Sequence, residues 1–187
     1  DDAVGEAFDK VASMLSLPYP GGPALEKLAL TGTASRYPLA PVVVKGNPYH
    51  FSYSGLKTKM LYTLKGQNSN KYSKVLLPEE EWPHVAAAFQ EAALGDLVNK
   101  TVAASKEYNM NTVVIGGGVA NNQRLRKLFA VHPTLKTLWP PKDLTLDNAA
   151  MIAGLGYHYW KKNPQGAALS VEASPNLSLT AESIFND

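Results

Sequence analysis

Apolar residues recur at helical spacing near the start of the chain. The stretch from residue 3 to residue 15 places its apolar side chains on one helical face, namely Val4, Ala7, Phe8, Val11 and Leu15. This spacing predicts an amphipathic helix. The sequence "LPYPGGP" then ends the helix, because its prolines and glycines cannot continue it. A short second helix is expected over residues 24–30.

The later part of the chain alternates between strand and helix patterns. "PEEEW" at 78–82 predicts a helix start, with a proline followed by carboxylates in the first turn, and this helix should run to about Tyr108. The elements expected after it are a strand at 112–115, a helix at 121–130, a strand at 135–138 and a helix at 148–160. This alternation predicts an α/β layer with a parallel sheet. Residues 32–78 are rich in Pro, Gly, Ser and Tyr, and are expected to be irregular.

Composition excludes several classes of protein. Hydrophobic residues make up 45% of the chain and charged residues 18%, which is the balance of a folded globular protein. Cysteine is absent, so disulfides and thiolate metal sites are excluded. No apolar run approaches the roughly 20 residues of a membrane helix, and the first ten residues are not a signal peptide. We therefore expect no membrane partner and a cytoplasmic location.

The sequence "VVIGGGVANNQRLRKLF" at 113–129 combines a strand, a glycine turn and a helix. Glycines let the backbone approach a ligand closely, and a helix N-terminus favours an anion such as phosphate. Asn121 or Asn122 could then contact a sugar. The pattern matches neither G-x-G-x-x-G nor a P-loop. The alternative is a turn that packs helix against strand, with an asparagine as the N-cap.

Five stretches, in order along the chain, resemble signature sequences of the TsaD family. They are "DDAVGEAFDK", "YPGGPALEK", "FSYSGLKT", "GGGVANNQRLR" and "LTLDNAAMIA", and the resemblance runs from Asp1 to about Gly156. It implies an actin-like, sugar-kinase-like (ASKHA) α/β fold of two lobes. It also implies transfer of a threonylcarbamoyl group from threonylcarbamoyl-adenylate to N6 of adenosine 37 in tRNAs that read codons starting with A.

The resemblance assigns roles to five residues of this chain. It implies that Asp9, Gly22, Glu26 and Asn122 bind the adenylate substrate and that Asp147 is a metal ligand. Each position also has an ordinary structural interpretation. Asp9 could be an exposed helix carboxylate, and Glu26 could pair with a nearby lysine. Gly22 could be present only because the turn requires a glycine. Asp147 stands where the N-cap of the following helix is expected.

The resemblance also implies one divalent metal per full-length protein, iron or possibly zinc. Its histidine ligands would come from an H-x-x-x-H pair that this chain lacks. One carboxylate cannot hold such a metal, so we expect the chain alone to bind none and to be inactive. Leu146 stands where the family usually has Thr before its metal-binding aspartate, so the ligand is kept but the residue that supports it differs.

The chain is accordingly interpreted as most of a C-terminal lobe, without its first strands. It is divided into a helical ligand-binding segment at 1–31, an irregular basic insert at 32–78 and an α/β part at 79–187. The partners that the resemblance implies are the missing N-terminal half, a TsaB-like paralogue, a TsaE-like ATPase and tRNA.

Charge distribution independently suggests an RNA-binding surface. Residues 27–78 contain no acidic side chain but eight basic ones, interleaved with six tyrosines and phenylalanines. Such a stretch can follow a phosphate backbone and stack on unpaired bases, and Lys57, Lys59 and Lys65 are its candidate contacts. A solvated surface with half-buried tyrosines is the alternative.

Two other function classes remain as alternatives. The chain could be a non-catalytic scaffold that binds a nucleotide or a paralogous partner. The family was also formerly described as a metallo-endopeptidase, but no H-E-x-x-H helix occurs here to supply metal ligands and a base.

Overall fold

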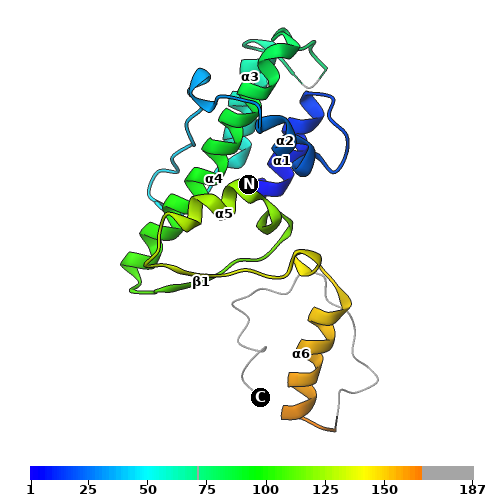
Figure 1. Ribbon diagram of the computed structural model, residues 1–187, viewed down its shortest axis with the longest axis vertical. Helices are drawn as coiled ribbons and strands as arrows, with labels where there is room; N and C mark the ends of the chain where they lie inside the picture. The colour runs from blue at the N-terminus through cyan, green and yellow to red at the C-terminus, as the bar shows by residue number, and fades with distance from the viewer. Residues whose placement is uncertain (71, 166–187) are drawn as a thin grey trace. The chain divides into compact units, whose positions relative to one another are not determined.

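The computed structural model describes residues 1–70 and 72–165. The chain divides into two compact units, Asp1–Leu146 and Asp147–Asp187. The first unit contains helices α1 to α5 and a small sheet, whereas the described part of the second contains helix α6, Ala149–Lys162 (Figure 1). None of the described helices is long and apolar enough to cross a membrane.

Helices α1 (Val4–Met14) and α2 (Gly21–Ala29) pack closely against each other. The first helix was predicted correctly, and the second begins three residues earlier than expected. Gly21 explains the close packing, because a Cβ at this position would stand 2.6 Å from the Cβ of Ala12. The apolar face of α1 is buried, with Phe8 and Val11 almost inaccessible.

The segment 32–78 is not irregular throughout, which corrects the sequence-based expectation. It contains helix α3, Tyr53–Lys65. Leu56, Met60 and Leu64 recur every four residues along α3 and are fully buried. The glycines, serines and tyrosines around them had obscured this helical spacing.

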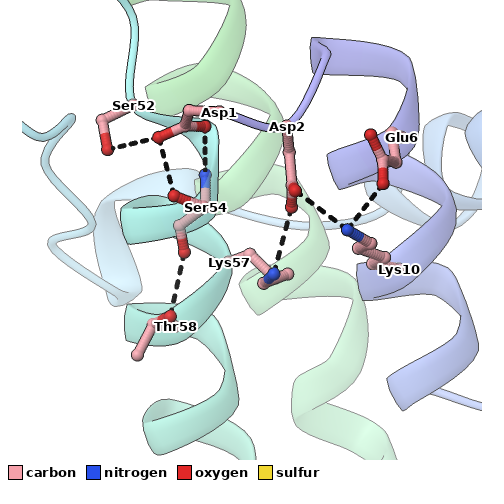
Figure 2. Close-up of polar contacts among 8 residues, drawn as sticks. All are labelled: Asp1, Asp2, Glu6, Lys10, Ser52, Ser54, Lys57 and Thr58. Carbon is pink, nitrogen blue, oxygen red and sulfur yellow. Dashed lines mark hydrogen bonds and ion pairs between the residues drawn. The ribbon is translucent and has the colours of Figure 1, made fainter.

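The N-terminus of α3 is held by a residue far away in the sequence. The carboxylate of Asp1 accepts hydrogen bonds from the backbone N–H of Ser54 at 2.9 Å, from its hydroxyl at 2.6 Å and from the hydroxyl of Ser52 at 2.9 Å. Asp1 therefore satisfies a free donor of the first turn, as a capping residue does, but from another segment (Figure 2).

The adjacent residue, Asp2, joins α1 to α3. Its carboxylate accepts from Lys10 of α1 at 2.9 Å and from Lys57 of α3 at 3.0 Å, and the Asp2 side chain is 16% exposed (Figure 2). These two hydrogen bonds lower the pKa of Asp2 below its usual value of 3.8. Two of the sequence stretches, "DDAVGEAFDK" and "FSYSGLKT", are thereby tied together.

Helix α4 (Trp82–Glu107) forms the centre of the first unit. A single turn of 3-10 helix, Glu79–Glu81, precedes it, and α2, α3 and α5 each pack against it. Its first half is buried almost all round, and Phe89 meets Phe8 of α1 edge to face, with ring centroids 5.1 Å apart. The helix ends one residue before the predicted Tyr108.

A two-stranded parallel sheet follows α4. Strand β1 (Thr112–Val114) pairs with β2 (Lys136–Leu138), and Val113 lies opposite Thr137. Helix α5 (Gln123–Ala130) makes the crossover between them, preceded by a 3-10 turn at Gly118–Asn121. The predicted strand–helix–strand order and the parallel pairing are confirmed, and the mixture of helices with a small parallel sheet is that of an α/β fold.

Candidate functional site: a groove between helices α2, α4 and α5

The glycine turn after β1 leaves its backbone open at two positions. A Cβ added to Gly116 or Gly117 would meet nothing within 4 Å, whereas one added to Gly118 would lie 3.0 Å from Leu146. Gly117 has a φ of +84°, a conformation that favours glycine. The turn thus connects β1 to the start of α5 with few side-chain atoms around its backbone.

Asn122, directly before α5, is buried, and both ends of its side-chain amide are hydrogen-bonded. Its Oδ1 accepts from the backbone N–H of Leu125 at 2.9 Å, and its Nδ2 donates to Oε1 of Gln90 on α4 at 3.1 Å. The N-cap interpretation of this asparagine is confirmed. Its neighbour Asn121 instead donates to the hydroxyl of Thr145 at 2.7 Å.

The structure brings Asp9 and Gly22 together. Oδ1 of Asp9 on α1 accepts from the backbone N–H of Gly22 at 3.1 Å, in the first turn of α2. Asp9 is therefore not a free carboxylate on an exposed helix face. A Cβ added to Gly22 would meet no atom within 4 Å, so the space beside its backbone is open.

Glu26 reaches from α2 to the N-terminus of α5. Its Oε1 accepts from the backbone N–H of Gln123 at 2.7 Å, so it does not serve as the partner of a lysine on its own helix. The other oxygen, Oε2, accepts no hydrogen bond from any residue that the structure describes. Glu26 thus pairs with a helix N-terminus, where a carboxylate is favourably placed, and keeps one oxygen available.

A groove of about 460 Å³ lies beside Glu26. Its polar lining comes from α2, α4 and α5: Glu26, Gln90, Glu91, Gln123, Arg124 and Lys127. Of the four residues predicted to bind substrate, Glu26 lines this groove, whereas Asp9, Gly22 and Asn122 hold the elements around it. Two further hollows, of about 490 and 480 Å³, share Tyr49 and Phe51 and are lined by none of the four.

Five of the six polar groove residues were missed by sequence reasoning, among them Arg124 and Gln90. Arg124 pairs with Glu91 through both of its oxygens, and this hydrogen bonding raises the pKa of the Arg124 guanidinium, which stays charged. Gln90 is 6% exposed and lies in the run "AAAFQEAAL". The sequence signal that could have identified Gln90 is a polar side chain within an apolar helical run. No feature of the sequence indicates that Arg124 pairs with Glu91.

The structure places Asp147 in the second unit, with its side chain exposed. The N-cap of α6 is Asn148, whose Oδ1 accepts from the backbone N–H of Met151 at 3.1 Å, so the capping interpretation of Asp147 is wrong. No group of three metal-binding side chains occurs among residues 1–70 and 72–165. The described residues of this chain therefore do not fit a divalent metal by themselves.

The lysines of the candidate RNA surface are partly neutralised or buried. Lys57 pairs with Asp2, the ammonium of Lys59 donates to the carbonyl of Ala40 at 2.9 Å, and Lys65 is 8% exposed. Arg36, in the same basic stretch, pairs with a carboxylate outside it, that of Glu81, at 2.7 Å. Another lysine of the stretch, Lys71, lies outside the described residues.

Comparison with known proteins identifies the family. The family model described as tRNA N6-adenosine threonylcarbamoyltransferase, TsaD, matches residues 1–154. Relatives with that name include a Protochlamydia amoebophila protein, 51% identical over 92% of this chain and 50% of its own length. Proteins of Thermosipho africanus and Bacillus licheniformis are 43% and 41% identical over 96% and 97% of this chain, and each is covered over 52% of its length. The chain spans about half the length of these relatives, and it belongs to the tRNA N6-adenosine threonylcarbamoyltransferase family, TsaD.

Proposed function

We propose that the full-length protein transfers a threonylcarbamoyl group from threonylcarbamoyl-adenylate to N6 of adenosine 37 in tRNAs that read codons starting with A. The family match over residues 1–154 carries this proposal. In that protein the present chain supplies most of the C-terminal lobe of an actin-like fold. The isolated chain spans about half the length of its relatives, and we expect it to be inactive.

The adenylate is bound around the groove by Asp9, Gly22, Glu26 and Asn122. The free Oε2 of Glu26 supports a contact with ribose hydroxyls, because a carboxylate accepts from two such donors. Asp9 and Gly22 hold α1 against α2, and Asn122 holds the start of α5, which keeps the walls of the site in position. The backbone of Gly22 has open space beside it for an approaching ligand.

One divalent metal, iron or zinc, belongs to the full-length protein, with Asp147 as one of its ligands. The described residues of this chain do not form a metal site, so no step of the reaction is assigned to the metal. Its remaining ligands come from the other half of the protein.

The macromolecular partners are tRNA, a TsaB-like paralogue and a TsaE-like ATPase, and the reaction is cytoplasmic. Among the candidate tRNA contacts, Lys59 is exposed, Lys57 forms an ion pair with Asp2, and Lys65 is buried. An RNA phosphate competes best for the exposed ammonium group, so Lys59 is the strongest of the three.

The experiment is a transfer assay with the full-length protein, its partner proteins, threonylcarbamoyl-adenylate and unmodified tRNA. We expect modified adenosine with the wild type and none with the present chain alone. Glu26→Gln should raise the KM for the adenylate while tRNA binding is retained, because one ribose acceptor becomes a donor.

A different result would point to the alternative function. If the complete protein binds adenylate and partners but modifies no tRNA, it is a nucleotide-binding scaffold. Transfer by the isolated chain would contradict the requirement for the other half.

A further inference from the structure

We propose that Gln90, a buried residue of α4, is a ligand-binding residue of the groove. Its side-chain amide nitrogen donates to an acceptor atom of the ligand, beside the free oxygen of Glu26. The orientation of this amide is imposed by Asn122 and, through it, by the N-terminus of α5. This inference rests on the proposed function, because it takes the ligand to be the adenosine part of the substrate.

The orientation of Gln90 follows from a chain of hydrogen bonds. The backbone N–H of Leu125 can only donate, so the Asn122 atom 2.9 Å from it must be the oxygen. The other terminal atom of Asn122 is then the nitrogen, which donates to Gln90 at 3.1 Å. The Gln90 atom that receives this bond must therefore be its oxygen. The Gln90 amide nitrogen is therefore not bonded to Asn122.

The amide nitrogen of Gln90 has no acceptor among the residues that the structure describes. The side chain is nevertheless 6% exposed and lines the groove. Among the described residues, the buried side-chain atoms without a partner are Tyr53 Oη and Asn121 Oδ1, so the unpaired Gln90 nitrogen keeps some accessible surface. It can therefore donate to water or to a ligand in the groove that Gln90 lines.

The two free groups of the groove define the class of ligand. Glu26 offers an acceptor through Oε2, and Gln90 offers donors through its amide nitrogen. A nucleoside fits both, because it carries hydroxyl donors on the ribose and acceptor nitrogens and oxygens elsewhere. In this arrangement Asn122 acts as a positioning residue for Gln90.

Two substitutions in the full-length protein test the assignment. Gln90→Glu still accepts from Asn122 but presents an oxygen to the ligand in place of the donor. Asn122→Asp keeps the N-cap, yet its second oxygen now needs a donor, so Gln90 must turn its nitrogen away from the groove. We expect both to weaken the binding of adenosine, measured by calorimetry, about five- to 150-fold.

Controls separate binding from folding and from charge. Gln67→Glu adds a carboxylate at an exposed glutamine after α3 and should leave adenosine affinity unchanged. Thermal unfolding of each variant reports stability, and if Gln90→Glu fails to fold, Asn122→Asp carries the test. Because Asn122 acts through Gln90, Asn122→Asp should weaken adenosine binding no further in a Gln90→Met background.

The outcomes distinguish this inference from the proposed function. Wild-type affinity in both variants, with tRNA modification intact in the wild type, overturns the role of Gln90 and leaves the function standing. Lower thermal stability without loss of adenosine affinity likewise makes Gln90 a packing residue. A wild type that neither binds adenosine nor modifies tRNA overturns both.

Discussion

At the residue scale, Asn122 is a side chain for which the sequence offered two interpretations. Its sequence context, after a glycine turn and before a helix, suggested either a ligand contact or an N-cap. In the structure it is the N-cap of α5, its Nδ2 donates to Gln90, and it does not line the groove. Under the proposal for Gln90, Asn122 affects binding by fixing a neighbour, and the Gln90→Met background distinguishes this from a direct contact.

The first prediction concerns the charge of Asp2. Its pKa is lowered in the folded protein by Lys10 and Lys57, so the ionised form stabilises the fold. That stabilisation is present above the usual pKa of 3.8 and is lost as pH falls through the lowered folded value. Asp2→Asn should therefore unfold at lower urea than the wild type at about pH 7, and the difference should narrow at an acid pH below 3.8.

The control for this prediction is Glu80→Gln, at an exposed carboxylate before α4. It should show little difference from the wild type at either pH. If the difference in urea unfolding between wild type and Asp2→Asn stayed the same at acid pH, the contribution of Asp2 to stability would not depend on its charge.

Helix α3 illustrates, at the element scale, what local sequence could not provide. Its residues include Gly55 and Thr58, which are poor helix formers, and no side chain of its own caps its start. The cap is Asp1, which lies 53 positions before Ser54 in the sequence. Helices α1 and α4 have strong apolar patterns or a proline-led start, and both were predicted. A helix such as α1 or α4 can be predicted because its stabilising pattern lies within its own segment, whereas α3 depends on a contact from another segment.

The second prediction separates the lysines of α3. Lys59 is exposed, whereas Lys65 is buried. In the full-length protein, Lys59→Gln should weaken tRNA binding and reduce the salt dependence of the binding constant by about one unit of slope. Lys65→Gln should instead lower the free energy of unfolding and leave the salt slope unchanged.

Filter binding over a series of salt concentrations, with urea unfolding in parallel, measures both effects. Equal and unchanged tRNA affinity in the two variants would remove α3 from the RNA-binding surface. A loss confined to Lys65→Gln, with stability retained, would reverse the assignment.

The third prediction applies to the whole molecule. The chain holds Asp147 but no group of three metal-binding side chains among its described residues. After extensive dialysis we expect it to retain no stoichiometric iron or zinc by elemental analysis, while the full-length protein retains metal. About one equivalent in the isolated chain, lost on Asp147→Ala, would contradict this and place a complete site within half of the protein.

At this scale, the sequence predicted the order of the elements and the parallel sheet, since apolar periodicity and glycine turns are local signals. The family resemblance assigned Asp9 and Gly22 to the same ligand, but the hydrogen bond between them was not predicted. The sequence could not predict the groove itself. The pairing of Glu26 with the N-terminus of α5 joins residues 97 positions apart, and Gln90 gains its orientation from a third segment. Such contacts depend on the packing of α2, α4 and α5, which no local pattern encodes.

The contacts of Asp1 and Asp2 with α3 also have a consequence for dynamics. They close a loop of about fifty residues, and opening it would free the first-turn N–H group that Asp1 binds. Amide protons in the first turn of α3 should then exchange with solvent at a rate set by the residues at positions 1 and 2. Hydrogen exchange would thus follow the opening of the loop as a local event, separate from global unfolding.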